Sequence, residues 1–203
     1  MRLGVLGGTF DPIHLGHLAA AEAAMECAHL ERVLFIPSAQ PPHRGAAQAR
    51  ADDRLAMSKL AVDGDPRFEV SDVEVKRGGK SYTADTLDEL HRSRPGDELF
   101  LILGWDAARL LRTWHEPDRV GALASFVIVG RPGIPPPTPA NLKAAGIDPV
   151  RAVTCLLPTP DVSGSELRRA IVAGESVAGK VPAAVERYIA AHHVYGDNRR
   201  VGN

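Results

Sequence analysis

The sequence predicts an α/β fold, namely a doubly wound parallel sheet with helices on both faces and a small C-terminal helical piece. Short apolar segments alternate with longer segments of helical spacing, which is typical of strand–helix–strand units in a parallel sheet. Two of the apolar segments, residues 99–103 and 126–129, are continuous. Continuous apolar segments of this length are typical of strands that are buried on both faces.

The first elements follow this alternation in order. Strands are expected at residues 2–6 and 32–36, and helices at residues 15–27 and 51–62. Pro37 ends the second strand, because proline lacks the N–H that a sheet requires. Met57, Leu60 and Ala61 recur at i, i+3 and i+4, which is the spacing of one helix face.

The middle of the chain continues with a strand segment and a helix. Phe68, Val70, Val73 and Val75 predict extended chain with a break near Asp72. Residues 82–91 have helical spacing, and Ser81 or Thr83 is expected to cap that helix, because a hydroxyl can accept from a free N–H of the first turn.

The sharpest change of composition is GRPGIPPPTP at residues 130–139, which predicts an elbow without regular structure. After it we expect a weak helix, a strand at 152–157 and helices at 165–172 and 182–192. Because 203 residues fit one domain, residues 1–203 are interpreted as one domain, in which 140–203 pack back on the sheet.

Composition and charge exclude several classes of partner. A net charge of −1 gives no overall field that would attract nucleic acid or an acidic membrane surface. No apolar run approaches the ~18 residues of a membrane span, and the N-terminus lacks the layout of a signal peptide. Cys27 and Cys155 stand alone in the sequence, which indicates a reducing cytoplasm and no structural zinc. A homo-oligomer is compatible with the sequence.

The segment GGTFDPIHLGH, residues 7–17, contains the main candidates for ligand-binding and catalytic residues. It follows the first strand and precedes the first helix, and ligands of open parallel sheets bind beyond such strand ends. Gly7 and Gly8 allow a ligand to approach the backbone closely, and the helix N-terminus offers unpaired N–H groups that suit phosphate. His14 and His17, at i and i+3, share one face of the first turn.

Other interpretations of these segments are weaker. One alternative is a glycine-rich turn in which Asp11 caps the helix and the two histidines are ordinary surface residues. It would leave the presence of both histidines on one face of the first turn, directly after a strand end, to coincidence. Zinc binding by the pair lacks an evident third ligand. The dinucleotide motif GxGxxG is absent. The segment GESVAGKV at 174–181 looks like a phosphate-binding loop but is not interpreted as one, because it follows a helix and lacks Ser or Thr after Lys180.

The segment at 7–17 resembles the signature of the HxGH nucleotidyltransferase superfamily, and specifically that of bacterial nicotinate-nucleotide adenylyltransferases. The resemblance extends along the chain through PPHR (41–44), SYTADTL (81–87), LGWD (103–106), TW (113–114), GRPG (130–133), VSGSELR (162–168) and VPAAVERYIAAHHVY (181–195). The order and spacing of these motifs make it specific. It implies a Rossmann-like fold and transfer of AMP from ATP to nicotinate mononucleotide, giving nicotinate adenine dinucleotide and pyrophosphate in NAD biosynthesis.

The resemblance also implies roles for individual residues. It assigns the catalytic role to His14 and His17 and contacts with ATP to Gly7, Gly8, Thr9, Phe10, Gly104, Asp106, Ser163, Ser165 and Arg168. Asp106 would accept both ribose hydroxyls, and Arg168 would clamp phosphate from a helix start. Mg²⁺ is expected mainly on the ATP phosphates, and no protein ligand for a metal is assigned.

For nicotinate mononucleotide the resemblance implies contacts from His43, Arg44, Thr83, Trp114 and His115, with Trp114 stacking on the pyridine ring. From the residues alone, Arg168 could be a surface arginine, Asp106 a helix cap, Trp114 a core residue, and His43 and Arg44 a solvated loop. The chain departs from the family pattern at Lys80, Trp105, His115 and Gly164, where Pro, a smaller residue, Tyr, and Ser or Thr are usual.

Rival functions stay open at this level. One is an adenylyltransferase that prefers nicotinamide mononucleotide, and another is a nucleotide-binding regulator without catalysis. The SYT and TW motifs argue against phosphopantetheine as the acceptor, and the chain lacks the length and the KMSKS-type loop of a class I tRNA synthetase.

Overall fold

Six parallel strands form one sheet in the order β3-β2-β1-β4-β5-β6 in the computed structural model, which describes residues 1–42, 47–130 and 133–196. The strands are β1 (Arg2–Gly8), β2 (Arg32–Pro37), β3 (Phe68–Val70), β4 (Glu98–Gly104), β5 (Ser125–Val129) and β6 (Ala152–Cys155). The predicted parallel, doubly wound sheet is confirmed. The connections leave β1 towards β2 on one side and return to β4 on the other, so the switch point of the sheet lies between β1 and β4.

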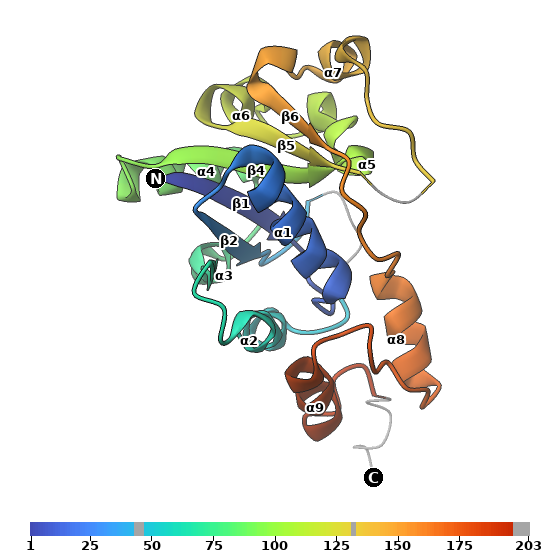
Figure 1. The fold of residues 1–203 in the computed structure, drawn as a ribbon. Coiled ribbons are helices and arrows are strands. Elements are labelled where there is room, and N and C mark those ends of the chain that lie inside the picture. Colours follow the sequence, from blue (N-terminus) through green and yellow to red (C-terminus); the bar gives the residue numbers. More distant parts are fainter. Residues whose placement is uncertain (43–46, 131–132, 197–203) are drawn as a thin grey trace.

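Helices cover both faces of this sheet (Figure 1). They are α1 (Leu15–Ala28), α2 (Ala51–Val62), α3 (Val73–Arg77), α4 (Thr83–Ser93), α5 (Trp105–Ala108), α6 (Pro117–Leu123), α7 (Pro139–Ala145), α8 (Gly164–Val172) and α9 (Ala183–Ala191), with single 3₁₀ turns η1 (Leu111–Thr113) and η2 (Pro149–Arg151). Among the described residues no helix is long and apolar enough to cross a membrane.

Side chains of the strands alternate between two cores, as the period of a strand requires. In β4, Phe100 and Ile102 join the core under α1, α2, α8 and α9, whereas Leu99, Leu101 and Leu103 join the core under α4, α6 and α7. This two-sided burial explains why the sequence of β4 is a continuous apolar segment.

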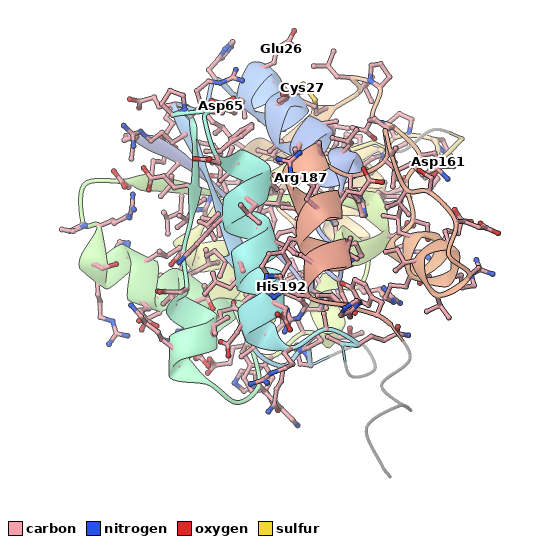
Figure 2. The ribbon with its side chains drawn as sticks, turned by 90° about the horizontal axis from the view of Figure 1, so that it is seen from below. Glu26, Cys27, Asp65, Asp161, Arg187 and His192 are labelled. Atoms are coloured by element: carbon pink, nitrogen blue, oxygen red, sulfur yellow. A yellow bond between two sulfur atoms is a disulfide. The ribbon has the colours of Figure 1, made fainter. Side chains whose placement is uncertain are left out.

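The C-terminal helices lie against the N-terminal half of the chain. Figure 2 shows α9, which carries Arg187 and ends just before His192, beside α2. Val185 and Ile189 of α9 are buried in the same core as Met57 of α2. The end of the described chain is thereby brought back towards the first loop.

Some local predictions are wrong. Val73–Arg77 forms helix α3 rather than extended chain, although the predicted break falls at Asp72, its N-cap residue. Tyr82 is the N-cap of α4, whereas Ser81 accepts a hydrogen bond from Ala39 N at 2.9 Å through its Oγ, so tertiary contact takes the hydroxyl that was expected to cap.

The elbow is shorter than predicted at its C-terminal end. Pro139 begins α7 behind the N-cap Thr138, which accepts from Asn141 N, so this proline serves as a helix start. The short helices α5 and α6 were not predicted, because four and seven residues are too few to show a helical period.

The two cysteines are not alone in the folded chain. Cys27 and Cys155 form a disulfide between the last turn of α1, where Figure 2 labels Cys27, and the end of β6. They lie 128 residues apart in sequence, so only the packing of α1 over β6 brings their Cα atoms to 5.7 Å. The inference from solitary cysteines to a reducing compartment is therefore wrong in its premise.

Candidate active site

The predicted site lies at the carboxyl end of β1, beside the switch point of the sheet. Gly7 and Gly8 end β1, and Gly104 ends β4, the neighbouring strand. A Cβ on Gly7 would meet no atom within 4 Å, so the space in front of this strand end is open. A Cβ on Gly8 would lie 2.8 Å from the Phe10 ring, so only glycine fits beneath that ring. The main chain at Gly7 can therefore be approached closely, whereas the missing side chain of Gly8 makes room for the Phe10 ring.

Thr9 and Phe10 begin the loop that leads to α1. The Phe10 side chain is buried in the core, and its ring meets the His17 ring edge-on with centroids 5.0 Å apart. A contact of Phe10 with ATP would thus come from its main chain. In the same loop, the peptide bond between Asp11 and Pro12 is cis.

The two histidines lie together at the start of α1. His14 is the N-cap and is buried, and its ring stacks on that of His17 with centroids 3.7 Å apart. The Nδ1 atom of His17 accepts a hydrogen bond from the main-chain N–H of His14 at 3.3 Å. In the neutral ring the proton is then on Nε2, which makes that atom a donor suited to a phosphate oxygen.

The first turn of α1 offers fewer N–H groups than predicted. The Leu15 N–H donates to the carbonyl of Lys180 at 2.9 Å, and the His17 N–H donates to the carbonyl of His14 at 2.9 Å. The protein itself thus uses two donors that a phosphate was expected to take. Lys180 belongs to the 174–181 segment, which forms a turn with a bridge between Ala178 and Val181 and is not the strand–helix loop of a phosphate site.

Gly16 is a site residue that the sequence analysis missed. A Cβ at this position would lie 3.1 Å from the His14 ring and 3.4 Å from the carbonyl of Pro160. Glycine therefore lets the ring of His14 and the 160 segment close on the helix start. The signal was present in the HLGH pattern, where a glycine separates the histidines.

The VSGSELR motif meets the first loop from the opposite side. Arg168 of α8 donates from Nη1 to the main-chain oxygen of Asp11 at 2.7 Å and from Nη2 to Ser165 Oγ at 3.3 Å. Its buried Nε–H has no hydrogen-bond partner among the described residues. Arg168 is the fifth residue of α8 and so lies inside the helix, not at its start, whereas Ser163 is the N-cap.

Gly164 also faces the first loop. A Cβ there would lie 3.4 Å from the Asp11 oxygen, which is an ordinary contact, so the family's hydroxyl residue would reach the same loop.

Asp106 is the second residue of α5, two residues beyond the N-cap Gly104. Its carboxylate is about half exposed, at 46%, and lies 3.9 Å from Arg109 Nη2. The cap interpretation is thus wrong, because the N-cap is Gly104 and Asp106 follows it in the first turn. Trp105 packs against the core beneath α4 and α6, which accounts for its size but not for its difference from the family pattern.

The fold brings the SYT and TW motifs together. Thr83 is the first residue of α4, and the ring of Tyr82 before it lies on the His115 ring with centroids 4.2 Å apart. Trp114 is partly buried against the core beneath α4 and α6, which agrees in part with its interpretation as a core residue. Tyr82 was not predicted as a site residue, and its only signal was its place between Ser81 and Thr83.

His43 and Arg44 lie outside the described residues. The chain that leads to them is tied to the SYT segment, because Ser81 N–H donates to the carbonyl of Gln40 at 2.9 Å. The described residues hold no group of three or more His, Cys, Asp or Glu side chains arranged to bind a metal ion.

Arg54 is a buried residue that holds the loops of the site, and the sequence did not predict this role. Its side chain is 1% exposed and donates to the carbonyls of Thr9 at 2.6 Å, Ala39 at 3.1 Å and Ala49 at 3.2 Å. Burial lowers the pKa of this guanidinium, and the nearby Asp11 carboxylate opposes that shift. One cation thus joins the loop after β1 to both ends of the loop between β2 and α2.

The chain is similar to known proteins of one family. Residues 5–170 match the model of the cytidylyltransferase-like family. The chain is 48% identical over 195 residues to a protein of Thermus thermophilus named "probable nicotinate-nucleotide adenylyltransferase", covering 96% of this chain and 100% of the relative. A protein of the same name from Thermomicrobium roseum is 42% identical, with 96% and 91% covered.

A similar fold is found in the Plasmodium falciparum nicotinic acid mononucleotide adenylyltransferase complexed with NaAD. The TM-score is 0.76 at 17% sequence identity, and the match covers 96% of this chain and 97% of the other. At that identity the likeness shows the shared fold.

Proposed function

Because this chain belongs to the nicotinate-nucleotide adenylyltransferases of the cytidylyltransferase-like family, we propose that it transfers AMP from ATP to nicotinate mononucleotide. The products are nicotinate adenine dinucleotide and pyrophosphate. The observation that carries the proposal is the pair of stacked histidines at the start of α1. Arg168 contacts the loop that links β1 to these histidines, because it donates to the main-chain oxygen of Asp11.

The reaction is a direct in-line displacement. A phosphate oxygen of the mononucleotide forms a bond to the α-phosphorus of ATP, and the bond from that phosphorus to the bridging oxygen of pyrophosphate breaks. The attacking phosphate is ionised at neutral pH, so no general base is required and no covalent intermediate with the protein forms. The protein positions two anions that repel each other and supplies donors where negative charge develops.

The described residues fit these tasks. Nε2–H of His17 and the guanidinium of Arg168 would donate to the triphosphate, with His14, Ser163 and Ser165 beside them. ATP would lie over Gly7, Gly8, Thr9, Phe10 and Gly104 and bring Mg²⁺ with it as a Mg·ATP substrate. The Asp106 carboxylate would accept from the adenosine ribose.

The acceptor would occupy the other side of the same edge. Its pyridine ring would stack on Trp114, and its carboxylate would accept from Thr83 and the main-chain N–H of His115. His43 and Arg44 would face its phosphate. The ring of His115 lies against Tyr82, and its Nε2 is 3.8 Å from Glu116 Oε2, which supports a main-chain contact rather than a ring contact with the substrate.

The acceptor preference tests this function. We expect kcat/KM for nicotinate mononucleotide to exceed that for nicotinamide mononucleotide by at least about tenfold, because a site of donors leaves the amide N–H₂ unpaired. The measurement is pyrophosphate release from ATP with each acceptor in turn. Equal rates or a preference for the amide would contradict the acid specificity. ATP binding without release from either acceptor would favour a regulator without catalysis.

The assignment of the two nucleotide sites can be tested at Asp106. We expect Asp106→Ala to raise KM for ATP about tenfold or more, because two hydrogen bonds to a charged acceptor are lost, and to leave KM for the acceptor almost unchanged. Asp118→Ala is the matched control, since Asp118 is likewise the second residue of a short helix, α6. A rise of KM for the acceptor alone would show that the two sites are exchanged.

Three further proposals rest on the same function. Residues 1–203 act as one domain, which is supported by the packing of α9 on α2. The enzyme works in the cytoplasm, where ATP is supplied, although a disulfide is uncommon in that compartment. Its ligands are small nucleotides rather than nucleic acid or membrane.

A further inference from the structure

The carboxylate of Asp11 is a point where four segments of the chain meet. Its Oδ2 accepts from Gln48 N at 2.8 Å, and its Oδ1 accepts from Ala49 N at 3.0 Å and from the hydroxyl of Tyr195 at 2.8 Å. Asp11 is 8% exposed. The loop before α2 and the end of the described chain thus hold the same side chain of the first loop.

Asp11 in turn holds Arg168. The main-chain oxygen of Asp11 accepts from Nη1 of Arg168 at 2.7 Å, and Oδ2 lies 3.8 Å from the same nitrogen. The Nε–H of Arg168 is buried without a partner among the described residues, which suits a group that receives an anionic ligand. The direction of this guanidinium therefore depends on where Asp11 is held.

Tyr195 reaches Asp11 from 184 residues away. It follows α9 in a turn with φ of 72°, and α9 is held on the core beside α2 by the buried side chains of Val185 and Ile189. Burial, followed by the Asp11 carboxylate, raises the pKa of the Tyr195 phenol. Its hydroxyl accordingly stays protonated and donates to Asp11 throughout the neutral range.

We propose that Tyr195 is a positioning residue of the AMP-transfer site, which acts through Asp11 to hold Arg168 against the ATP phosphates. The proposal rests on the function given above. Without the hydroxyl, the carboxylate of Asp11 loses one of its donors and can rotate towards Arg168, and the guanidinium then no longer has a single direction. The change would weaken the binding of ATP and leave the binding of the acceptor almost unaffected.

The test compares Tyr195→Phe with Tyr188→Phe. Each change removes one hydroxyl that donates to a carboxylate from the C-terminal part of the chain, but only Tyr195 reaches the first loop. We expect Tyr195→Phe to lower kcat/KM for ATP about tenfold and to weaken ATP binding by a similar factor, as loss of a hydrogen bond to a charged group does. KM for the acceptor should change less than about twofold, and Tyr188→Phe should match the wild type in each measurement.

A double-mutant cycle with Asp11→Ala adds a second readout, because alanine leaves the Tyr195 hydroxyl no side-chain oxygen to donate to. If Tyr195 acts through Asp11, Tyr195→Phe should have a much smaller effect on ATP binding in the Asp11→Ala background than alone. Full additivity of the two changes would overturn the proposal.

Two other results would also overturn it. One is equal ATP binding by Tyr195→Phe and Tyr188→Phe. The other is a loss that follows only the fraction of unfolded protein and disappears on cooling, as a purely structural role requires. Calorimetric ATP binding needs no turnover, so failure of the proposed reaction in the wild type would be distinguished from failure of this proposal.

Discussion

Replacing His17 with alanine is expected to lower turnover by about 10²–10³ while the fold stays intact, which is the usual effect of removing one donor to the developing charge. The Nδ1 of His17 accepts from the His14 N–H, so the neutral ring carries its proton on Nε2 and can donate it to a phosphate oxygen. Alanine is a good helix former, and His17 is only partly buried, so α1 should persist. The measurement is kcat for pyrophosphate release, together with the melting temperature.

Two further variants sharpen this prediction. His91→Ala removes an exposed histidine from α4 and should leave kcat unchanged. His17→Gln retains an N–H donor of similar reach and should recover part of the loss. Turnover of His17→Ala within a few-fold of the wild type would remove His17 from the mechanism.

Replacing Arg54 with methionine is expected to lower the free energy of unfolding by about 3 kcal/mol. The methionine side chain ends where the guanidinium of arginine begins and has no donors, so the carbonyls of Thr9, Ala39 and Ala49 lose the hydrogen bonds that the guanidinium gives them. Each carbonyl left unsatisfied costs about 1–3 kcal/mol, and removal of the buried charge returns part of that sum. Urea denaturation measures the change, with an unchanged slope as evidence that the unfolding transition is the same.

The matched control is Arg67→Met. Arg67 binds Asp65 at the surface, with 53% of its side chain exposed, and such pairs contribute about 0–1 kcal/mol. Arg54→Lys should recover only part of the stability, because one ammonium cannot reach three carbonyls. If Arg54→Met and Arg67→Met unfold at the same urea concentration, the three hydrogen bonds contribute no net stability.

Much of the fold could be predicted because its signals are local. The spacing of Met57, Leu60 and Ala61 marks a helix face, and the helix bounds of 51–62 agree with α2. The continuous segment at 99–103 marks a strand buried on both sides, as β4 is. Val73 and Val75 misled the prediction because two alternating valines fit one turn of helix as well as a strand. There, packing against the sheet decides between the two.

The candidate site divides in the same way. The glycines and histidines of 7–17 are neighbours in sequence, and a strand followed by a helix puts them at the strand end whatever the rest of the chain does. The contact between Tyr82 and His115 could not be predicted from either motif alone, since it depends on how α4 lies beside the segment after β4.

The sequence by itself therefore determined the longer strands and helices and their alternation, the parallel sheet, and the place of His14 and His17 at its edge. Periodicity, glycine and proline act over a few residues and can be recognised without neighbours. Only the tertiary structure decided that Cys27 meets Cys155, that Arg54 joins the loop after β1 to the loop before α2, and that Tyr195 holds Asp11. These contacts join residues that are distant in sequence, and they form because the collapsed chain must pair each buried polar group with whatever partner packing brings within reach.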